Sequence, residues 1–210
     1  MELQKTGCMM NLQNIIDKKL HILKNKATSL SSSYNIHDQY LDNSELFYRG
    51  LCISYHKIFK HINDKQNVLD FGAGIGCSQF VYDMSPQKWN LSLADMIDIK
   101  WRNNDENKFF NEVRNSMGYD TLHMSNVLKD NFTIDTTNKF DCVIFFRFPP
   151  LTHNDTNGKK LREKIKPWIT EDCLFIYANS IEHYHEKFDF FLENDYTILE
   201  CEGPLVVVSF

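Results

Sequence analysis

Asn67-Val-Leu-Asp-Phe-Gly-Ala-Gly-Ile-Gly76 is the stretch of sequence that decides the fold. Its first half, from Val68 to Phe71, is apolar apart from Asp70 and predicts a short buried strand. Glycines follow at every second position: Gly72, Gly74 and Gly76. Glycine adopts positive φ without steric cost and lets a ligand approach the backbone closely. A helix-like segment begins at Cys77, so the stretch predicts a strand, a tight turn and a helix in series.

The spacing of these glycines discriminates between ligands. A dinucleotide-binding fingerprint requires Gly-x-Gly-x-x-Gly, with glycine or alanine at the sixth position. Here Cys77 stands at that position, and the third glycine comes one residue earlier. The pattern from Asp70 to Gly76, Asp-x-Gly-x-Gly-x-Gly, resembles motif I of the class I S-adenosylmethionine (SAM)-dependent methyltransferases. A structural turn or a site for another nucleotide is the alternative.

Apolar strands alternate with helical patterns from Asn67 onwards. Strands are predicted at 67–71, 90–95, 120–125, 141–146, 173–178, 196–201 and 204–209, and helices at about 76–85, 103–117, 157–168 and 182–193. Near-continuous apolar strands separated by helices indicate a parallel sheet covered on both faces. The last two strands are joined only by Glu202-Gly-Pro204, which is too short for a crossover, so we expect them to be antiparallel.

The sequence therefore predicts an α/β fold with a doubly wound, seven-stranded, mostly parallel sheet and an antiparallel C-terminal hairpin. This arrangement also resembles the class I methyltransferase core. Two helices are predicted before the first strand. Residues 1–28 carry an amphipathic pattern, which Leu30-Ser-Ser-Ser33 is expected to break, and a second helix is expected from about Ser44 to Ile62. We expect residues 1–64 to form an N-terminal helical addition and residues 65–210 to form the SAM-binding core.

Composition narrows the class of protein. The chain has 210 residues, of which 42% are hydrophobic and 13% aromatic, as expected for one globular domain. Its formal net charge of −5 provides no global basic field to attract nucleic acid. No stretch approaches the ~18 apolar residues of a membrane span, so a cytoplasmic protein without a membrane partner is expected. The 6 cysteines lack a Cys-x-x-Cys pair and are expected to be reduced thiols.

Two acidic residues follow predicted strands near the glycines. The resemblance implies that Asp70 shapes the loop near the methionine part of SAM; alternatively, Asp70 caps its own turn. Asp95 ends the second strand, where an acid about 20 residues beyond the glycines accepts hydrogen bonds from a ribose diol. The resemblance implies that Asp95 binds the SAM ribose and that Met96 lies against the adenine. Asp98 is the alternative if the strand is longer, and a solvated loop acid is the structural alternative.

Further cofactor contacts are implied by the resemblance alone. Many family members carry an aspartate after the third strand for the adenine amino group. This chain has Ser125-Asn126 there, and an amide carbonyl accepts the same hydrogen bond, although a turn-forming asparagine is equally open. The predicted set that holds SAM, or its product S-adenosylhomocysteine, is Asp70, Gly72, Ala73, Gly74, Gly76, Asp95, Met96, Ser125, Asn126 and Phe146.

The fourth strand runs into Phe148-Pro-Pro-Leu151, where the resembled family brings methyl donor and acceptor together. The two prolines resemble the (Asp/Asn/Ser)-Pro-Pro-(Tyr/Phe) motif of amino-methyltransferases. Both diagnostic flanking residues differ here, which disfavours a nucleobase as acceptor. We predict that Arg147 holds an anionic group of the acceptor and that His153 removes a proton where the acceptor must lose one. Alternatively, Arg147 and His153 are ordinary residues of a loop that the prolines make rigid where the chain leaves the strand.

Other polar and aromatic residues carry weaker signals. Aromatic and histidine side chains gather in the N-terminal addition: Tyr34, His37, Tyr40 and Tyr48. In small methyltransferases such an addition covers the SAM pocket and contributes to the acceptor site, and packing of the helix is an equal alternative. His183 and His185 form a His-x-His pair without a third ligand, so no metal site is predicted.

The sequence thus predicts a SAM-dependent methyltransferase that acts on a small molecule, because the chain is acidic and shows no separate recognition domain. Two other functions stay open. One is methylation of nucleic acid or protein nitrogen, which a basic surface near Pro149 would favour. The other is a non-catalytic SAM-binding partner subunit. The acceptor and the oligomeric state are not specified by the sequence.

Overall fold

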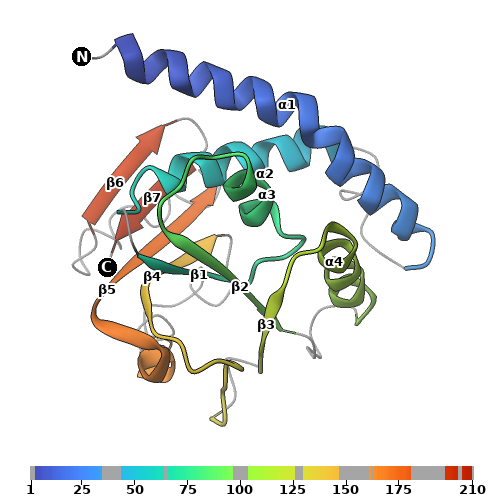
Figure 1. Ribbon diagram of the computed structural model, residues 1–210. Helices are drawn as coiled ribbons and strands as arrows, with labels where there is room; N and C mark the ends of the chain where they lie inside the picture. The colour runs from blue at the N-terminus through green and yellow to red at the C-terminus, as the bar shows by residue number, and fades with distance from the viewer. Residues whose placement is uncertain are drawn as a thin grey trace. The chain divides into compact units, whose positions relative to one another are not determined.

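The structure is a computed structural model that describes residues 3–34, 44–63, 66–96, 104–125, 130–146, 161, 163–180, 197–202 and 205–209 (Figure 1). Two compact units divide the chain. The helical unit comprises Met1–Lys57, Ala73–Gln87 and Ile97–Thr121, and the sheet unit comprises Ile58–Gly72, Lys88–Met96 and Leu122–Phe210. The domain boundary expected between residues 64 and 65 stays a prediction.

Seven strands form one sheet in the order β3-β2-β1-β4-β5-β7-β6. The strands are β1 (Asn67–Phe71), β2 (Asn90–Met96), β3 (Thr121–Met124), β4 (Phe140–Phe146), β5 (Ile169–Ser180), β6 (Thr197–Glu202) and β7 (Leu205–Ser209). The pairs β1–β2, β1–β4 and β4–β5 are parallel. β7 lies between β5 and β6 and is antiparallel to both. The structure therefore confirms the expected α/β class with a parallel sheet.

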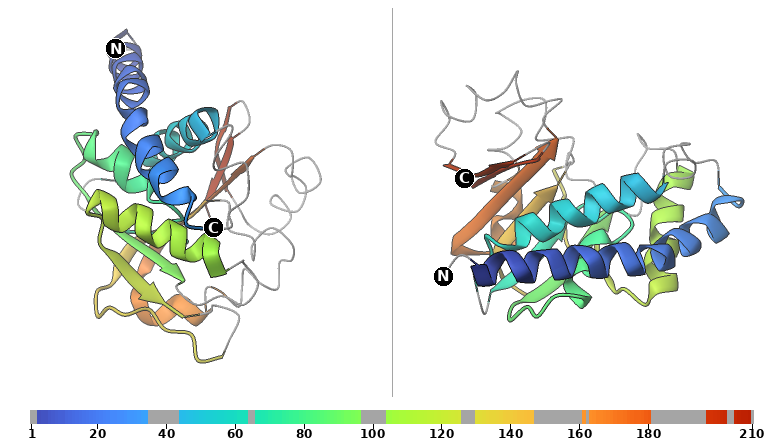
Figure 2. Two further views of the ribbon diagram at one scale, coloured as in Figure 1. Left: turned by 90° about the vertical axis from the view of Figure 1, so that its right-hand side faces the viewer. Right: turned by 90° about the horizontal axis from the view of Figure 1, so that it is seen from above.

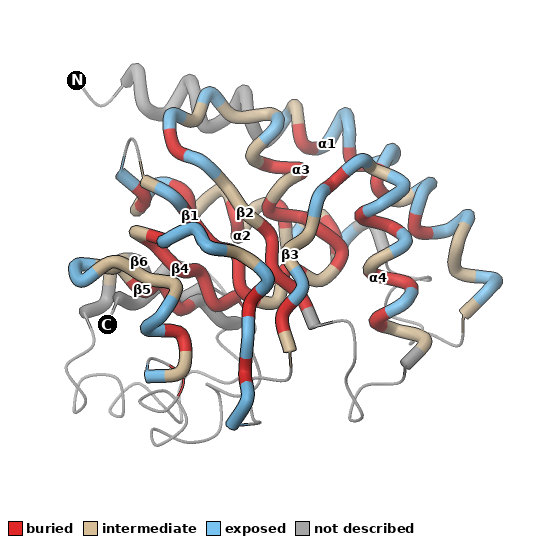
Figure 3. Tube along the Cα trace, turned by 60° about the horizontal axis from the view of Figure 1, so that its bottom comes forward, coloured by how far each residue is buried: buried red, intermediate tan, exposed pale blue. Residues whose placement is uncertain are grey.

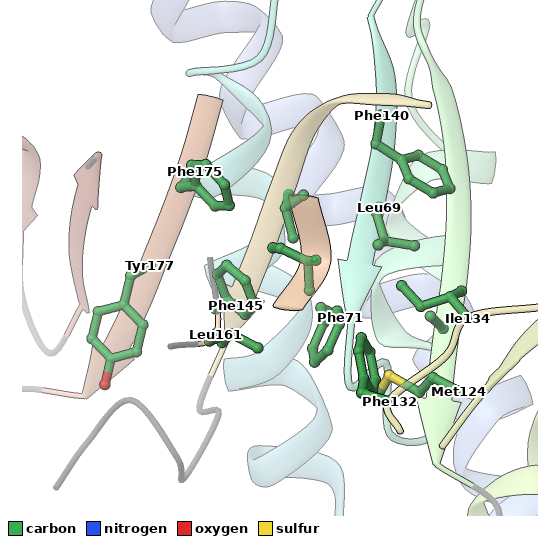
Figure 4. Close-up of a cluster of buried hydrophobic side chains, with 13 residues drawn as sticks. Leu69, Phe71, Met124, Phe132, Ile134, Phe140, Phe145, Leu161, Phe175 and Tyr177 are labelled. Carbon is green, nitrogen blue, oxygen red and sulfur yellow. The ribbon is translucent and has the colours of Figure 1, made fainter. Parts of the chain in front are cut away.

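Aromatic side chains on one face of the sheet fix the register of its strands (Figure 4). Phe145 of β4 lies between two rings, with its centroid 5.3 Å from that of Phe71 on β1 and 6.2 Å from that of Phe175 on β5. All three side chains are buried. Because a slip by one residue would turn every side chain to the other face, these contacts favour a single register of β1, β4 and β5.

The helical unit contains α1 (Leu3–Ser31), α3 (Cys77–Asp83), α4 (Asn104–Met117) and most of α2 (Ser44–Phe59). Buried positions recur along α1 at helical spacing and mark its packed stripe (Figure 3): Ile16, Leu20, Leu23 and Ala27. α2 runs alongside α1 (Figure 2), and Arg49 donates to both carboxylate oxygens of Asp17 at 2.7 and 3.2 Å.

The ends of several elements differ from those predicted. The amphipathic pattern was predicted to end at residue 28, and α1 continues to Ser31, so it ends within the segment Leu30–Ser33 where the break was expected. The hydroxyl groups of Ser29 and Ser31 donate to backbone carbonyls three residues earlier, so these serines close the last turn of the helix. α2 ends at Phe59, three residues before the predicted end.

Two predicted helices lie partly or wholly in residues that the structure does not describe. For the helix expected at 157–168, residues 161 and 163–165 are helical and lead into a short 3-10 helix, Lys166–Trp168. The Nε1 of Trp168 donates to the carbonyl of Thr136 at 3.2 Å. The helix expected at 182–193 lies outside the described residues.

Candidate functional site

β1 lies between β2 and β4 and carries Asp70 near its carboxyl end (Figure 1). Asp70 is in register with Leu93 of β2 and with Ile144 of β4. Side chains alternate between the faces of a strand, so Asp95, two residues beyond Leu93, shares the face of Asp70. By the same alternation Phe146, two residues beyond Ile144, also lies on this face. Three predicted site residues therefore meet at one edge of the sheet, on the face opposite the aromatic cluster.

The two acidic residues at this edge are buried, with Asp70 0% exposed and Asp95 8% exposed. The direction of the strand order also changes here, since β1 adjoins both β2 and β4. Open α/β sheets bind ligands outside the carboxyl ends of their strands at such a switch point. Asp70 and Asp95 thus lie at the edge of the sheet where this general rule predicts a ligand.

The glycine-rich loop leaves β1 directly at this edge. All three of its glycines have positive φ: 85° at Gly72, 56° at Gly74 and 86° at Gly76. In the sheet unit, the Gly72 N–H donates to the carbonyl of Ala94 at 2.8 Å, which ties the start of the loop to the residue before Asp95. Left-handed conformations at alternate positions explain why the sequence has glycine there.

Gly74 and Gly76 differ in their surroundings. A Cβ built on Gly74 would meet no described heavy atom within 4 Å. A Cβ on Gly76 would lie 3.0 Å from Cδ2 of Tyr119 and 3.2 Å from Cγ of Arg114. Gly76 is therefore required for packing, whereas none of the residues that the structure describes lies on the side of Gly74 that a Cβ would occupy. A glycine without a close neighbour on this side allows a ligand to approach the backbone closely.

Arg114 and Tyr119 contact the loop from the end of α4, and the sequence analysis missed both. Arg114 is 1% exposed, and its guanidinium donates to the carbonyl of Gly74. The Tyr119 N–H donates to the carbonyl of Arg114 at 3.0 Å, and burial raises the pKa of the Tyr119 phenol well above its usual range. The available signal was an arginine on the buried stripe of α4, beside Phe110 and Val113.

Ser125 follows β3, and its polar groups are engaged within its own turn. Its hydroxyl accepts a hydrogen bond from the Thr133 N–H at 2.7 Å and lies 3.5 Å from the carbonyl of Asn131. Its N–H donates to the carbonyl of Thr133 at 2.9 Å. The contacts of Ser125 thus shape the chain beyond β3. Asn126, the neighbouring candidate, lies outside the described residues.

Several other predicted residues also fall outside the described part of the chain. These are Asp98, Arg147, His153, the Pro149-Pro150 pair, His37, Tyr40, His183 and His185. Met96 is the last residue of β2, directly after Asp95. The roles assigned to these residues stay predictions.

Tyr34 and Tyr48 both pack within the helical unit. Tyr48 is 0% exposed, with its ring centroid 5.5 Å from that of Phe47. Tyr34 lies 6.1 Å from Phe109 of α4, ring to ring, and a hydrogen bond to Glu112 raises the pKa of its phenol. These contacts agree with the packing alternative for both tyrosines.

The described cysteines behave as structural residues. Cys52, Cys77, Cys142 and Cys173 are free thiols, as expected from the sequence. Burial raises the pKa of Cys173 to about 12 and that of Cys142 further still. Thiols with such raised pKa values are poor nucleophiles at neutral pH. Among the described residues, no group of three potential metal ligands gathers.

Solved structures of other proteins share this architecture, although no sequence match was found. No known protein family and no curated protein matches the sequence. PH0226 from Pyrococcus horikoshii OT3 is similar in structure, with TM-score 0.55 and 13% identity over 85% of this chain and 97% of that one. So is a putative methyltransferase from Pseudomonas syringae, with TM-score 0.50 and 7% identity over 78% and 98%. The chain has a class I methyltransferase-like fold.

A third solved structure agrees with this class of fold. The pyocyanin biosynthetic protein PhzM matches with TM-score 0.50 and 10% identity over 80% of this chain and 58% of that one. At these identities the likeness concerns the fold. No helix among the described residues combines the length and the apolar character needed to cross a membrane.

Proposed function

We propose that this protein is a SAM-dependent methyltransferase that acts on a small molecule. The observation that carries the proposal is the left-handed glycine loop, which leaves β1 beside two buried acids on one face of the sheet edge. The methyltransferase-like fold supports it, and the similar protein from Pseudomonas syringae is itself described as a putative methyltransferase.

The residues of this chain fit the cofactor. Asp95 accepts hydrogen bonds from the ribose hydroxyl groups, and Met96 lies against the adenine. The open side of Gly74 leaves room for the cofactor, because a Cβ there would meet no described atom within 4 Å. Asp70 and Phe146 complete the set from β1 and β4. Bound SAM supplies an electrophilic methyl group, and the protein holds and orients it and excludes water.

The acceptor is proposed to bind near the end of β4. Arg147 there holds an anionic group of the acceptor by charge-assisted hydrogen bonds. His153 takes the proton of an acceptor hydroxyl or amine, which is needed only where the acceptor is protonated. Asn126 accepts a hydrogen bond from the adenine amino group, because the hydroxyl of Ser125 is engaged with Thr133.

Net charge supports a small molecule over nucleic acid. At −5 the chain lacks the overall positive field that draws a protein to phosphates. Phe148, before the two prolines, lacks the polar group that would bind a flipped base, and Leu151, after them, lacks the aromatic ring that would stack on it.

Two measurements test the proposal. Calorimetry of the wild-type protein with S-adenosylhomocysteine should show binding at a single site, and failure to bind would end the SAM-dependent interpretation. Methyl-labelled SAM is then incubated with the protein and either mixed nucleic acid or a low-molecular-weight cell extract. Label in the small-molecule fraction supports the proposal, whereas label in nucleic acid overturns the acceptor class. Label in neither, despite tight cofactor binding, favours a non-catalytic SAM-binding subunit.

A further inference from the structure

We propose that Arg114 is a positioning residue that sets the conformation of the glycine-rich loop, an inference whose ligand-binding part rests on the function proposed above. Arg114 belongs to the last turn of α4 and donates to the Gly74 carbonyl, 40 residues away in sequence. Its side chain is 1% exposed. A guanidinium this deeply buried loses hydration, which is costly unless its donors find acceptors. The loop carbonyl is such an acceptor, so burial of Arg114 and the loop conformation stabilise each other.

The hydrogen bond orients the peptide group between Gly74 and Ile75. No cis peptide bond is present in the described chain, so this unit is planar and trans, with its C=O and N–H pointing in opposite directions. Since the carbonyl points toward Arg114, the Ile75 N–H points away from that side chain. Arg114 therefore fixes the direction of a backbone donor in the loop. A donor that is oriented before binding saves the cost of ordering it on binding.

The same side chain also shapes the far end of the loop. A Cβ built on Gly76 would lie 3.2 Å from the Cγ of Arg114 and 3.0 Å from the Cδ2 of Tyr119. Tyr119 is itself held by Arg114, because its N–H donates to the Arg114 carbonyl. The Gly76 N–H donates to the carbonyl of Ala73 at 3.0 Å, which closes the turn. Arg114 thus bonds the loop at Gly74 and fills the space beside Gly76 that a Cβ there would need.

An apolar side chain would fill the same volume but could not hold a carbonyl. Arg114→Met keeps the aliphatic stem of the side chain and removes its donors, whereas Arg114→Lys restores a charged donor group without the planar fork. Comparison of these two variants separates hydrogen bonding to the loop from packing. Two controls accompany them. Arg49→Met removes an arginine of the same unit that pairs with Asp17, and Val113→Ala loosens the buried stripe of α4.

The first measurement is amide hydrogen exchange of the cofactor-free protein. In Arg114→Met, the Gly76 amide should exchange about tenfold or more faster, because the turn that protects it loses its support. The Gly72 amide, which is bonded within the sheet unit, should keep its wild-type rate. The Gly76 exchange rate of Arg114→Lys should lie between those of wild type and Arg114→Met. If Arg114→Met does not fold, the rate in Arg114→Lys alone decides whether Arg114 supports the turn. Both control variants should leave the ratio of the Gly76 rate to the Gly72 rate unchanged.

The second measurement is the affinity for S-adenosylhomocysteine by calorimetry. Arg114→Met should lower it by roughly threefold to tenfold, because the unsupported loop must then be ordered on binding, with partial recovery in Arg114→Lys. The inference is overturned if the Gly76 amide exchanges at its wild-type rate in Arg114→Met. It is also overturned if Val113→Ala accelerates Gly76 exchange equally, or if the affinity of Arg114→Met is unchanged although exchange is faster. If the wild type binds no S-adenosylhomocysteine, the proposed function fails, while Gly76 exchange still decides whether Arg114 holds the loop.

Discussion

Gly74 and Gly118 form a natural pair for separating backbone strain from ligand space. Both have positive φ, 56° and 75°, and a Cβ on either would meet no described atom within 4 Å. Gly118 directly follows α4, whereas Gly74 lies in the loop after β1. Replacement by alanine strains both backbones to a similar degree, by about 1–2 kcal/mol. A difference between the two variants therefore reports on what lies beside Gly74.

We expect Gly74→Ala to weaken binding of S-adenosylhomocysteine by more than about tenfold, because the new methyl group occupies the space reserved for the cofactor. Gly118→Ala should lose similar thermal stability and keep wild-type affinity. Calorimetry and thermal unfolding on the same samples check both statements. Equal loss of affinity in the two variants would show that strain, and not occupied space, is responsible.

Asp95 is predicted to accept hydrogen bonds from the ribose of SAM, and a substitution of Asp141 is the matched control. Asp141 lies near the other end of the sheet, where its Oδ2 accepts a hydrogen bond from the Asn67 N–H at 2.8 Å. Asp95→Ala should weaken SAM binding by about 1–3 kcal/mol, the range for hydrogen bonds to a charged acceptor. Asp141→Ala should leave the affinity unchanged. Strong weakening by Asp98→Ala with none by Asp95→Ala would move the ribose site past the end of β2.

Among the elements, β4 carries the centre of the aromatic face. Phe145 is 0% exposed and contacts Phe71 and Phe175, so Phe145→Ala leaves a cavity in the sheet unit. We expect the free energy of unfolding to fall by about 3–5 kcal/mol, measured by urea denaturation. Leu46→Ala is the control, because Leu46 of α2 is 75% exposed and should change it by less than about 0.5 kcal/mol. Comparable losses in both variants would contradict this account of the core.

Strand positions were predictable from the sequence because the apolar runs are too short for helices and are flanked by turn-forming residues. The ends of elements were less predictable. α1 passes residue 28, where its amphipathic pattern was predicted to end, and stops at Ser31, whose hydroxyl donates to the carbonyl of Thr28. β5 begins at Ile169, before its apolar run, because Ile169 pairs with Phe140 of β4. Such pairings depend on tertiary neighbours that local patterns do not contain.

The candidate site was predictable where residues are close in sequence. The glycines and Asp70 stand in one motif, and Asp95 follows at a distance set by one helix and one strand. Arg114 could not be found in this way, because its role depends on a hydrogen bond that spans 40 residues. A buried arginine on an apolar helical stripe is nevertheless a general signal that a distant acceptor exists.

At the scale of the whole molecule, net charge decides how binding responds to salt. With a charge of −5 and a small acceptor, few counterions are released on binding. We expect the affinity for S-adenosylhomocysteine and the rate of methyl transfer to change less than about threefold between about 50 and 200 mM salt. A protein that neutralises six or more phosphates would lose roughly a thousandfold in affinity over this range. A steep salt dependence of methyl transfer would therefore favour a nucleic-acid acceptor.

The pairing of β1 with both β2 and β4 has a consequence for folding. Asn67 bonds Asn90 across 23 residues but Asp141 across 74, and the longer closure costs about 1 kcal/mol more in chain entropy. Domains are synthesised from the N-terminus, so β1 and β2 emerge well before β4. A nascent chain that has emerged only as far as α4 can form the bond from Gly72 to Ala94, while Phe71 still lacks its aromatic cover. We therefore expect the apolar face of β1 to stay exposed, and prone to aggregation, until β4 has been synthesised.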